Sequence, residues 1–220
     1  MEFCVCYNYN YSIQLIIFYI VYLMWEVVMK LIFIRHGQTD WNVAGKIQGS
    51  YDSELNNNGV KQSIELTEKL LKLNYKFSKI YSSPQKRALK TAEILSKHSN
   101  IDYFPMKGLE EMNMGEWEGL SWSEVEKKYP IEYREWFLNR RYTKTPNGES
   151  YNDMLKRVLK SIHKIIEDNS DNVVIVTHSA VIMSLQCYIT NTPFDEMLKF
   201  KPKNTEIIEI STDLLNNTNV

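Results

Sequence analysis

Arg35, His36 and Gly37 stand together directly after the apolar run "LIFI". An apolar run of this length that ends in glycine and polar residues is typical of a buried strand that ends in a loop. A second histidine, His178, follows the apolar run "NVVIVT" in the same way. Ligands of parallel sheets bind beyond the carboxyl ends of the strands. The sequence therefore predicts a site that contains both imidazoles.

Two histidines could serve a metal, a hydrolytic triad or a phosphoryl group. No HxH, HExxH or CxxC pattern supplies further ligands at the spacings that metal sites use. No GxSxG elbow is present, and "THSAV" does not supply one. Guanidinium groups bind phosphate oxygens in bidentate fashion, and an imidazole nitrogen can attack phosphorus. Arg35, Arg87 and His36 therefore favour phosphoryl transfer without a metal, whereas His98 and His163 lie in helical patterns and are interpreted as structural or solvated.

Short β-rich runs alternate with helical patterns from Lys30 onward. The predicted strands cover residues 30–34, 77–83 and 101–104, the start of 172–190, and 206–210. The predicted helices cover 59–74, 84–98 with Pro84 in the first turn, 151–169 with Ser150 as N-cap, and the remainder of 172–190. This alternation predicts an α/β fold: a three-layer α/β/α sandwich with a mostly parallel central sheet.

The segment 115–148 interrupts this alternation and is rich in aromatic and charged residues. We expect a helical insertion over the active site, which acts as a lid or substrate wall. Its aromatic and cationic residues are Trp117, Trp122, Tyr129, Tyr133, Trp136, Phe137, Arg140, Arg141 and Lys144. They could stack a ring and bind a second anion, or they could be the ordinary packing of a helical insertion.

The composition is that of an ordinary globular protein. The chain has 220 residues, a net charge of −1 and 44% hydrophobic residues, which fits a single domain with a real core. No block of Lys and Arg indicates nucleic-acid binding. The three cysteines form neither a disulfide framework nor a spaced ligand set, so we expect a reducing cytoplasmic setting.

Residues 1–28 differ from the rest because they contain no Lys or Arg. They lack the charged start of a secretory signal, and Ser12, Gln14 and Glu26 interrupt the apolar run that a spanning helix needs. We interpret them as an extension outside a domain of residues 29–220, with translation starting at Met29. A weak membrane anchor is the alternative. The oligomeric state is left open.

Several motifs resemble a known family when they are taken in order. "RHGQTDWN" is similar to the signature of the histidine phosphatase superfamily, also called the phosphoglycerate mutase-like family. "QGSYDSELNNNGVKQS", "YSSPQKRALKTA", "LEEMNMGEWEG", "PNGES" and "VTHSAV" match its later motifs. The resemblance covers about residues 30–210.

The resemblance implies a role for each matching residue. His36 would attack phosphorus and become a phosphohistidine, and Glu111, not Glu110, would protonate the leaving alkoxide; His178 completes the catalytic set. The implied substrate-binding residues are Arg35, Asn42, Gln48, Gly49, Arg87 and Ser179. No metal or cofactor is implied. Ser179 and Ala180 stand where many members have glycines, which puts backbone donation to a phosphate oxygen there in doubt.

The family contains both phosphatases and mutases. The interval between Glu111 and His178 is short, which resembles the compact phosphatase branch. We therefore expect a phosphomonoester hydrolase that acts on a small phosphorylated metabolite, such as α-ribazole 5′-phosphate, a phosphoglycerate or a sugar phosphate. The alternatives are a cofactor-dependent phosphoglycerate mutase and, more remotely, a non-catalytic phosphoester-binding module.

Overall fold

A five-stranded sheet forms the centre of the molecule in the computed structural model, which describes residues 28–216. Its strands are β1 (Lys30–Arg35), β2 (Lys79–Ser82), β3 (Tyr103–Pro105), β4 (Val173–Thr177) and β5 (Ile207–Ser211). The spatial order is β3-β2-β4-β1-β5, and only the β1–β5 pair is antiparallel. The prediction of a mostly parallel sheet is confirmed.

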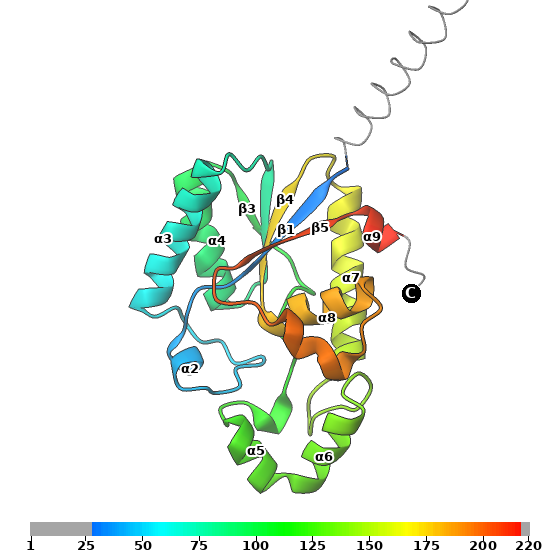
Figure 1. Cartoon of the computed structure of the whole chain (residues 1–220). Coiled ribbons are helices and arrows are strands. Elements are labelled where there is room, and N and C mark those ends of the chain that lie inside the picture. The colour runs from blue at the N-terminus through cyan, green and yellow to red at the C-terminus, as the bar shows by residue number, and fades with distance from the viewer. Residues whose placement is uncertain (1–27, 217–220) are drawn as a thin grey trace, which may run out of the picture.

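Helices cover both faces of this sheet (Figure 1). Helices α3 (Asn57–Lys72) and α4 (Lys86–Ser99) pack on one face, and α7 (Tyr151–Glu167) and α8 (Ser179–Ile189) pack on the other. Successive β1 residues alternate between the two layers: Ile32 joins the α3–α4 core and Phe33 the α7–α8 core. Because both faces are buried, the central strands are apolar at nearly every position. This is the predicted three-layer sandwich.

The helix starts show which local signals were interpreted correctly. Ser150 is the N-cap of α7 and accepts a hydrogen bond from the Asp153 amide, as predicted. The placement of Pro84 in the first turn of a helix is wrong, because α4 begins at Lys86. The Ser83 amide still donates to the Val176 carbonyl at 2.9 Å, so the chain continues along β4 and enters the helix three residues later.

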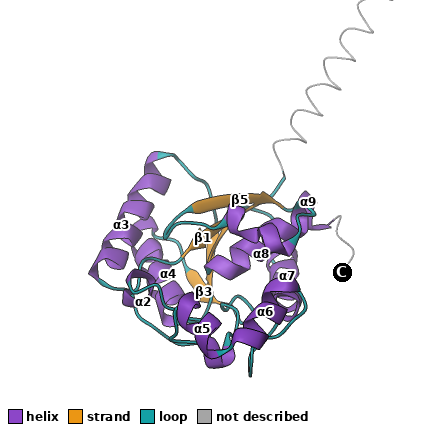
Figure 2. Cartoon of the chain, turned by 60° about the horizontal axis from the view of Figure 1, so that its bottom comes forward, coloured by secondary structure: helices purple, strands orange, loops and turns teal. Residues whose placement is uncertain are grey.

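The predicted insertion lies beyond the carboxyl ends of the parallel strands. It contains the 3-10 turn η1 (Gly115–Trp117), α5 (Trp122–Lys128) and α6 (Pro130–Leu138), coloured green below the sheet in Figure 1. Figure 2 turns this end of the molecule forward. The fully buried Trp117 packs edge-on against Trp136 at 5.4 Å between ring centroids, which anchors the insertion. The remaining short helices are α2 (Asp40–Val43), η2 (Phe194–Phe200) and α9 (Asp213–Asn216).

No helix between residues 28 and 216 is long and apolar enough to cross a membrane. The two interpretations of the N-terminal extension concern residues that, apart from Val28, lie outside the described range. The division into an extension and a domain of residues 29–220 therefore stays a prediction.

Candidate active site

A cavity of about 580 Å³ opens at the carboxyl ends of the strands, between the sheet and the insertion. All but one of the predicted site residues line it: Arg35, His36, Asn42, Gln48, Gly49, Arg87, Glu111 and Ser179. The exception, His178, lies against His36 with ring centroids 5.2 Å apart. The structure therefore brings the complete predicted set together.

His36 follows β1 and is held at both its backbone and its ring. Its amide donates to the Thr177 carbonyl at 3.0 Å, and its Nδ1 lies 2.7 Å from the Gly37 carbonyl. Because a carbonyl can only accept, Nδ1 carries the proton and Nε2 keeps its lone pair. The pKa of His36 is held well below its usual value, mainly by burial and to a smaller extent by the charges of Arg87 and Arg35. The imidazole is therefore neutral and nucleophilic at neutral pH.

Gly37 allows the loop after β1 to pack closely. A Cβ atom at this position would lie 2.5 Å from the Gly59 carbonyl oxygen at the start of α3. The Gly37 amide donates to Thr91 Oγ1 on α4 at 3.0 Å. The glycine beside the nucleophile thus lets two helices hold the loop from the same side.

Two arginines lie near the nucleophile, the fully buried Arg87 and the partly buried Arg35. Arg35 donates from Nη1 to the Pro202 carbonyl at 2.8 Å. Arg87 donates from Nη1 to the Tyr51 carbonyl at 2.7 Å and from Nη2 to the Gly49 carbonyl at 2.9 Å. The Nε atoms of both arginines are buried without a partner in the described part of the chain. Burial lowers the pKa of Arg87 to about 10, which leaves it cationic at neutral pH.

His178 occupies the N-cap position of α8, and the residues that follow it lie at the site. Its Nε2 lies 2.7 Å from Ser83 Oγ, and burial holds its pKa well below the usual value. Its Nδ1 and the Ser179 hydroxyl are buried and have no hydrogen-bond partner between residues 28 and 216. The Ala180 amide donates to Glu111 Oε2 at 3.2 Å. The first turn of α8 therefore supplies a backbone donor to a carboxylate.

Glu111 and Glu110 lie in different surroundings. Glu111 lines the cavity, and its Oε1 accepts from the Met112 amide at 3.0 Å. Burial raises its pKa, although the backbone donors and nearby arginines act in the opposite direction. A raised pKa keeps a larger fraction of the carboxyl protonated, which suits a proton donor. Glu110 instead lies 3.6 Å from Arg157 Nη1 and does not line the cavity.

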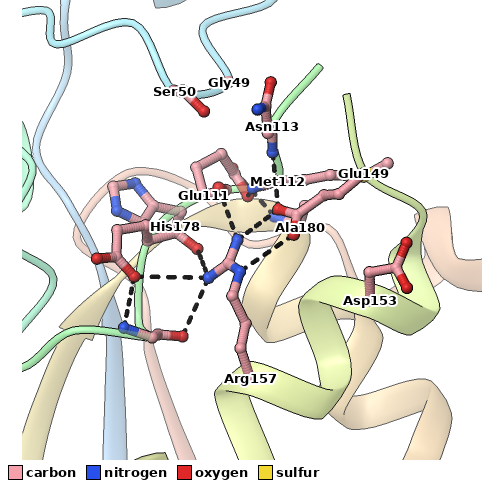
Figure 3. A network of polar contacts seen from close by, with 12 residues as sticks. Gly49, Ser50, Glu111, Met112, Asn113, Glu149, Asp153, Arg157, His178 and Ala180 are labelled. Carbon is pink, nitrogen blue, oxygen red and sulfur yellow. Dashed lines mark hydrogen bonds and ion pairs between the residues drawn. The ribbon is translucent and has the colours of Figure 1, made fainter. Parts of the chain in front are cut away.

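Arg157 on α7 holds the segment that carries Glu111, a position that no motif in the sequence indicated (Figure 3). Its Nη1 donates to the carbonyls of Gly108 and Glu110 at 3.0 and 2.8 Å, and its Nη2 donates to the Glu111 carbonyl at 2.9 Å. Glu149 pairs with the same guanidinium at 2.5 Å. A cation beside the buried positions of an amphipathic helix is the sequence signal that could have revealed it, because buried charges need partners.

Two amide side chains at the site were also missed. Gln85 donates from Nε2 to the Gly49 carbonyl at 3.0 Å and accepts from the Glu111 amide at 2.8 Å, so it joins two loops of the site. Asn204 donates from Nδ2 to the His36 carbonyl at 2.9 Å. Gln85 lies inside the motif "YSSPQKRALKTA", which was interpreted for its arginine alone. Asn204 lies in an irregular segment and carries no sequence signal.

The insertion contributes both to the cavity and to the core. Trp122, Tyr133, Trp136, Phe137 and Arg140 line the cavity. Trp117 is fully buried in the core. Lys144 does not line the cavity, and its Nζ lies 3.3 Å from Asp153 Oδ2. Arg141 stacks on Tyr142 and Phe194 and does not line the cavity. Some residues of this segment therefore line the cavity, and others serve only in packing or in ion pairs outside it.

A neutral imidazole beside two guanidinium groups, next to a carboxyl group of raised pKa in one cavity, is an arrangement that can support phosphoryl transfer. Residues 31–217 match the sequence model of the histidine phosphatase superfamily, branch 1. The chain belongs to this superfamily.

Named relatives support the phosphatase class. The chain is 32% identical over 166 residues to the metal-independent phosphoserine phosphatase of Arabidopsis thaliana. The matched segment covers 74% of this chain and 69% of that protein. A phosphoserine phosphatase from Entamoeba histolytica in complex with 3-phosphoglyceric acid matches with a TM-score of 0.70 at 31% identity, over 82% of this chain and 89% of that one. The α-ribazole phosphatase from Shigella flexneri matches with a TM-score of 0.73 at 26% identity, over 83% and 90%. The predictions of family, fold and phosphatase class are confirmed.

Proposed function

We propose that the protein hydrolyses small phosphomonoesters through a phosphohistidine at His36. The observation that carries this proposal is His36 Nε2, which holds a lone pair in a cavity beside Arg35 and Arg87. Nε2 attacks phosphorus while the bond to the leaving oxygen breaks, and the proton of Glu111 goes to that oxygen. Water then attacks the phosphohistidine, the P–N bond breaks, and the Glu111 carboxylate takes the proton of the water.

The charge on the phosphoryl group is met by donors from several loops. The unpartnered Nε atoms support Arg35 and Arg87 as ligands of the non-bridging oxygens, together with Nδ1 of His178. Asn42 accepts from the Thr39 amide through Oδ1, which leaves its NH₂ group to donate. The Ser179 hydroxyl is a further donor without another partner among the described residues.

Gln48 and Gly49 have a supporting position in this proposal. Gln48 Oε1 accepts from the Thr39 hydroxyl at 3.0 Å, and Gln48 lines the cavity. Its NH₂ group is therefore the part of the side chain that would donate to a substrate. The Gly49 carbonyl accepts from Arg87, so Gly49 orients that guanidinium. Its φ of +53° favours glycine, and a Cβ atom there would meet the Glu118 carboxylate.

Rapid-quench labelling tests the proposed intermediate. The enzyme is treated exhaustively with a chelator, mixed with a labelled phosphomonoester and quenched within one turnover. We expect label that is acid-labile and base-stable, and we expect none in His36→Ala. Label that persists in His36→Ala, or that disappears on chelation of the wild-type enzyme, would contradict the metal-independent phosphohistidine mechanism.

The substrate is proposed as a class. Phosphoserine, phosphoglycerates, sugar phosphates and α-ribazole 5′-phosphate are the compounds to compare, and the named relatives include enzymes for phosphoserine and α-ribazole phosphate. Incubation with 3-phosphoglycerate separates the two branches: a phosphatase releases phosphate, whereas a mutase forms 2-phosphoglycerate.

We infer a reducing, cytoplasmic setting because Cys187 is buried as a free thiol.

A further inference from the structure

His36 and His178 lie side by side, yet phosphoryl transfer requires opposite atoms from the two rings. His36 must present a lone pair to phosphorus, whereas a ring that faces the oxygens of the phosphoryl group must present an N–H. The Gly37 carbonyl fixes the tautomer of His36. The ring of His178 has one hydrogen-bond contact among residues 28–216, from Nε2 to Ser83 Oγ at 2.7 Å. A hydroxyl can donate or accept, so the surroundings of Ser83 decide the tautomer of His178.

The Ser83 hydroxyl has one way to satisfy both its oxygen and its proton. Ser83 is fully buried just after β2, and its Oγ accepts from the Gln85 amide at 3.3 Å. In the described chain, His178 Nε2 is the one acceptor within hydrogen-bond distance of this hydroxyl. If Nε2 carried the proton instead, Ser83 would keep a buried donor without a partner, which costs free energy. Ser83 therefore donates, and the proton of the neutral His178 ring lies on Nδ1.

Nδ1 is the atom of His178 that remains for a substrate. It is buried without a hydrogen-bond partner between residues 28 and 216, and the ring centroid lies 5.2 Å from that of His36. An N–H at this place donates to a non-bridging oxygen of a phosphoryl group at His36. A bare nitrogen at the same place would turn a lone pair toward an anion. The tautomer of His178 therefore decides whether this ring stabilises or repels the phosphoryl group.

We propose that Ser83 is a positioning residue, which sets the tautomer of His178 and thereby makes Nδ1 a donor to the phosphoryl oxygens. This inference rests on the proposed function, because it concerns the phosphoryl group that His36 receives. Ser83 keeps its own proton, and no group is transferred to it. It lies between β2 and α4, the helix that carries Arg87. One strand-to-helix connection therefore supplies a cation for the phosphoryl group and the hydroxyl that orients the second histidine.

Ser83→Ala and Ser82→Ala are a matched pair of variants. Both serines are fully buried, but the Ser82 hydroxyl donates to the Ser83 carbonyl and does not contact His178. We expect Ser83→Ala to lower kcat/KM roughly 10- to 100-fold, at or below the loss for removing a transition-state donor outright. Propyl phosphate and p-nitrophenyl phosphate should be slowed equally, because the phosphoryl group carries its charge with either leaving group. Ser82→Ala should keep the wild-type kcat/KM for both.

An effect through the proton donor is the competing explanation, since Gln85 donates to Ser83 Oγ and accepts from the Glu111 amide. In that case Ser83→Ala would slow the alkyl phosphate selectively, which would overturn the proposal. In a His178→Ala background, Ser83→Ala should change kcat/KM by no more than about twofold, because the residue through which it acts is gone. An equal loss in both backgrounds would also overturn the proposal.

Nitrogen NMR of enzyme labelled at histidine gives a readout that a merely structural role would not move. We expect His178 to show a protonated Nδ1 and an unprotonated Nε2 at neutral pH, and the Nε2-protonated form to appear in Ser83→Ala. The signals that vanish in His178→Ala assign the ring. A protonated Nε2 in the wild-type enzyme, or an unchanged tautomer in Ser83→Ala, would overturn the proposal. If His36 is labelled by propyl phosphate while these tests fail, only this inference fails; absence of phosphohistidine with every substrate defeats the proposed function itself.

Discussion

Glu110 and Glu111 show how neighbouring residues of one type acquire different chemistry. The Glu111 side chain is buried in the cavity and accepts hydrogen bonds from two backbone amides. The Glu110 side chain turns toward Arg157, where its charge is balanced at the surface of the fold. Burial therefore raises the pKa of the Glu111 carboxyl group, whereas the Glu110 carboxyl group forms an ion pair with Arg157. Two kinetic consequences follow for Glu111.

Replacing Glu111 by Gln should slow alkyl phosphates far more than aryl phosphates. An alkoxide needs a proton as it leaves, so the loss of a general acid costs roughly 10²- to 10⁴-fold, whereas a nitrophenolate leaves with little help. The measurement is kcat/KM for propyl phosphate and p-nitrophenyl phosphate in both enzymes. Glu110→Gln is the control and should keep the wild-type ratio between the two substrates. Equal slowing of both substrates by Glu111→Gln would move the proton donor elsewhere.

The pH profile for an alkyl phosphate should have two limbs set by opposite shifts. The pKa of Glu111 is raised by burial, so its proton persists above the ordinary range, and turnover falls as the pH rises through that raised pKa. The pKa of His36 is well below its ordinary value, so the nucleophile stays neutral until the pH falls through that lowered pKa. Profiles of kcat in wild type and Glu111→Gln test this. An alkaline limb that is unchanged in the variant would show that another group sets it.

At the scale of elements, the site depends on α7 as much as on the strands. The chain between β3 and η1 has no regular structure at Glu111, and Arg157 satisfies three of its carbonyls from the side (Figure 3). Glu149, just before the N-cap of α7, compensates the charge of this guanidinium. One helix therefore carries a clamp for the segment that holds the proton donor.

Arg157→Lys should loosen this segment and weaken the proton-donor step selectively. A lysine keeps the charge but cannot reach three carbonyls with a planar fork. We expect kcat for propyl phosphate to fall about 10-fold or more, with a smaller change for p-nitrophenyl phosphate. The free energy of unfolding should drop by roughly 1.5 to 3 kcal/mol, as for hydrogen bonds to charged groups. Lys160→Met, at an exposed position of the same helix, is the control for both measurements. Equal slowing of the two substrates would mean that Arg157 does not act through the proton donor.

For the whole molecule, we propose that residues 29–220 fold without the preceding segment. Met29 belongs to the α7–α8 core, and its carbonyl accepts from the amide and hydroxyl of Thr212, both at 3.1 Å. These contacts join the start of the described chain to its last helix region. A chain that begins at Met29 should therefore be soluble, with an unchanged melting temperature and kcat/KM within about twofold of the full chain. Loss of folding, or release of an otherwise membrane-bound protein, would show that residues 1–28 are required or act as an anchor.

The sequence by itself determined the sheet and the place of the two histidines. Apolar runs that end in polar residues are local signals, and they located β1 and β4 correctly. Because parallel strands end at the same edge, and Arg35 pairs with Thr177 in the register of β1 and β4, the next residues, His36 and His178, necessarily meet. Motif order then distinguished Glu111 from Glu110, which agrees with their positions in the fold.

Only the tertiary structure decided which atoms of these residues are available. The proton on His36 Nδ1 follows from the local turn that places the Gly37 carbonyl beside the ring. The hydrogen bonds from Arg157 to the Glu111 carbonyl and from Asn204 to the His36 carbonyl join residues that are distant in the chain. Arg140 and Arg141 are adjacent and identical in type, yet one lines the cavity and the other does not. Periodicity reports which side of an element is apolar, and it carries no information about irregular segments such as 139–150. The direction of a side chain there is set by packing against remote residues. Which residues of this segment line the cavity is therefore decided only when the chain has folded.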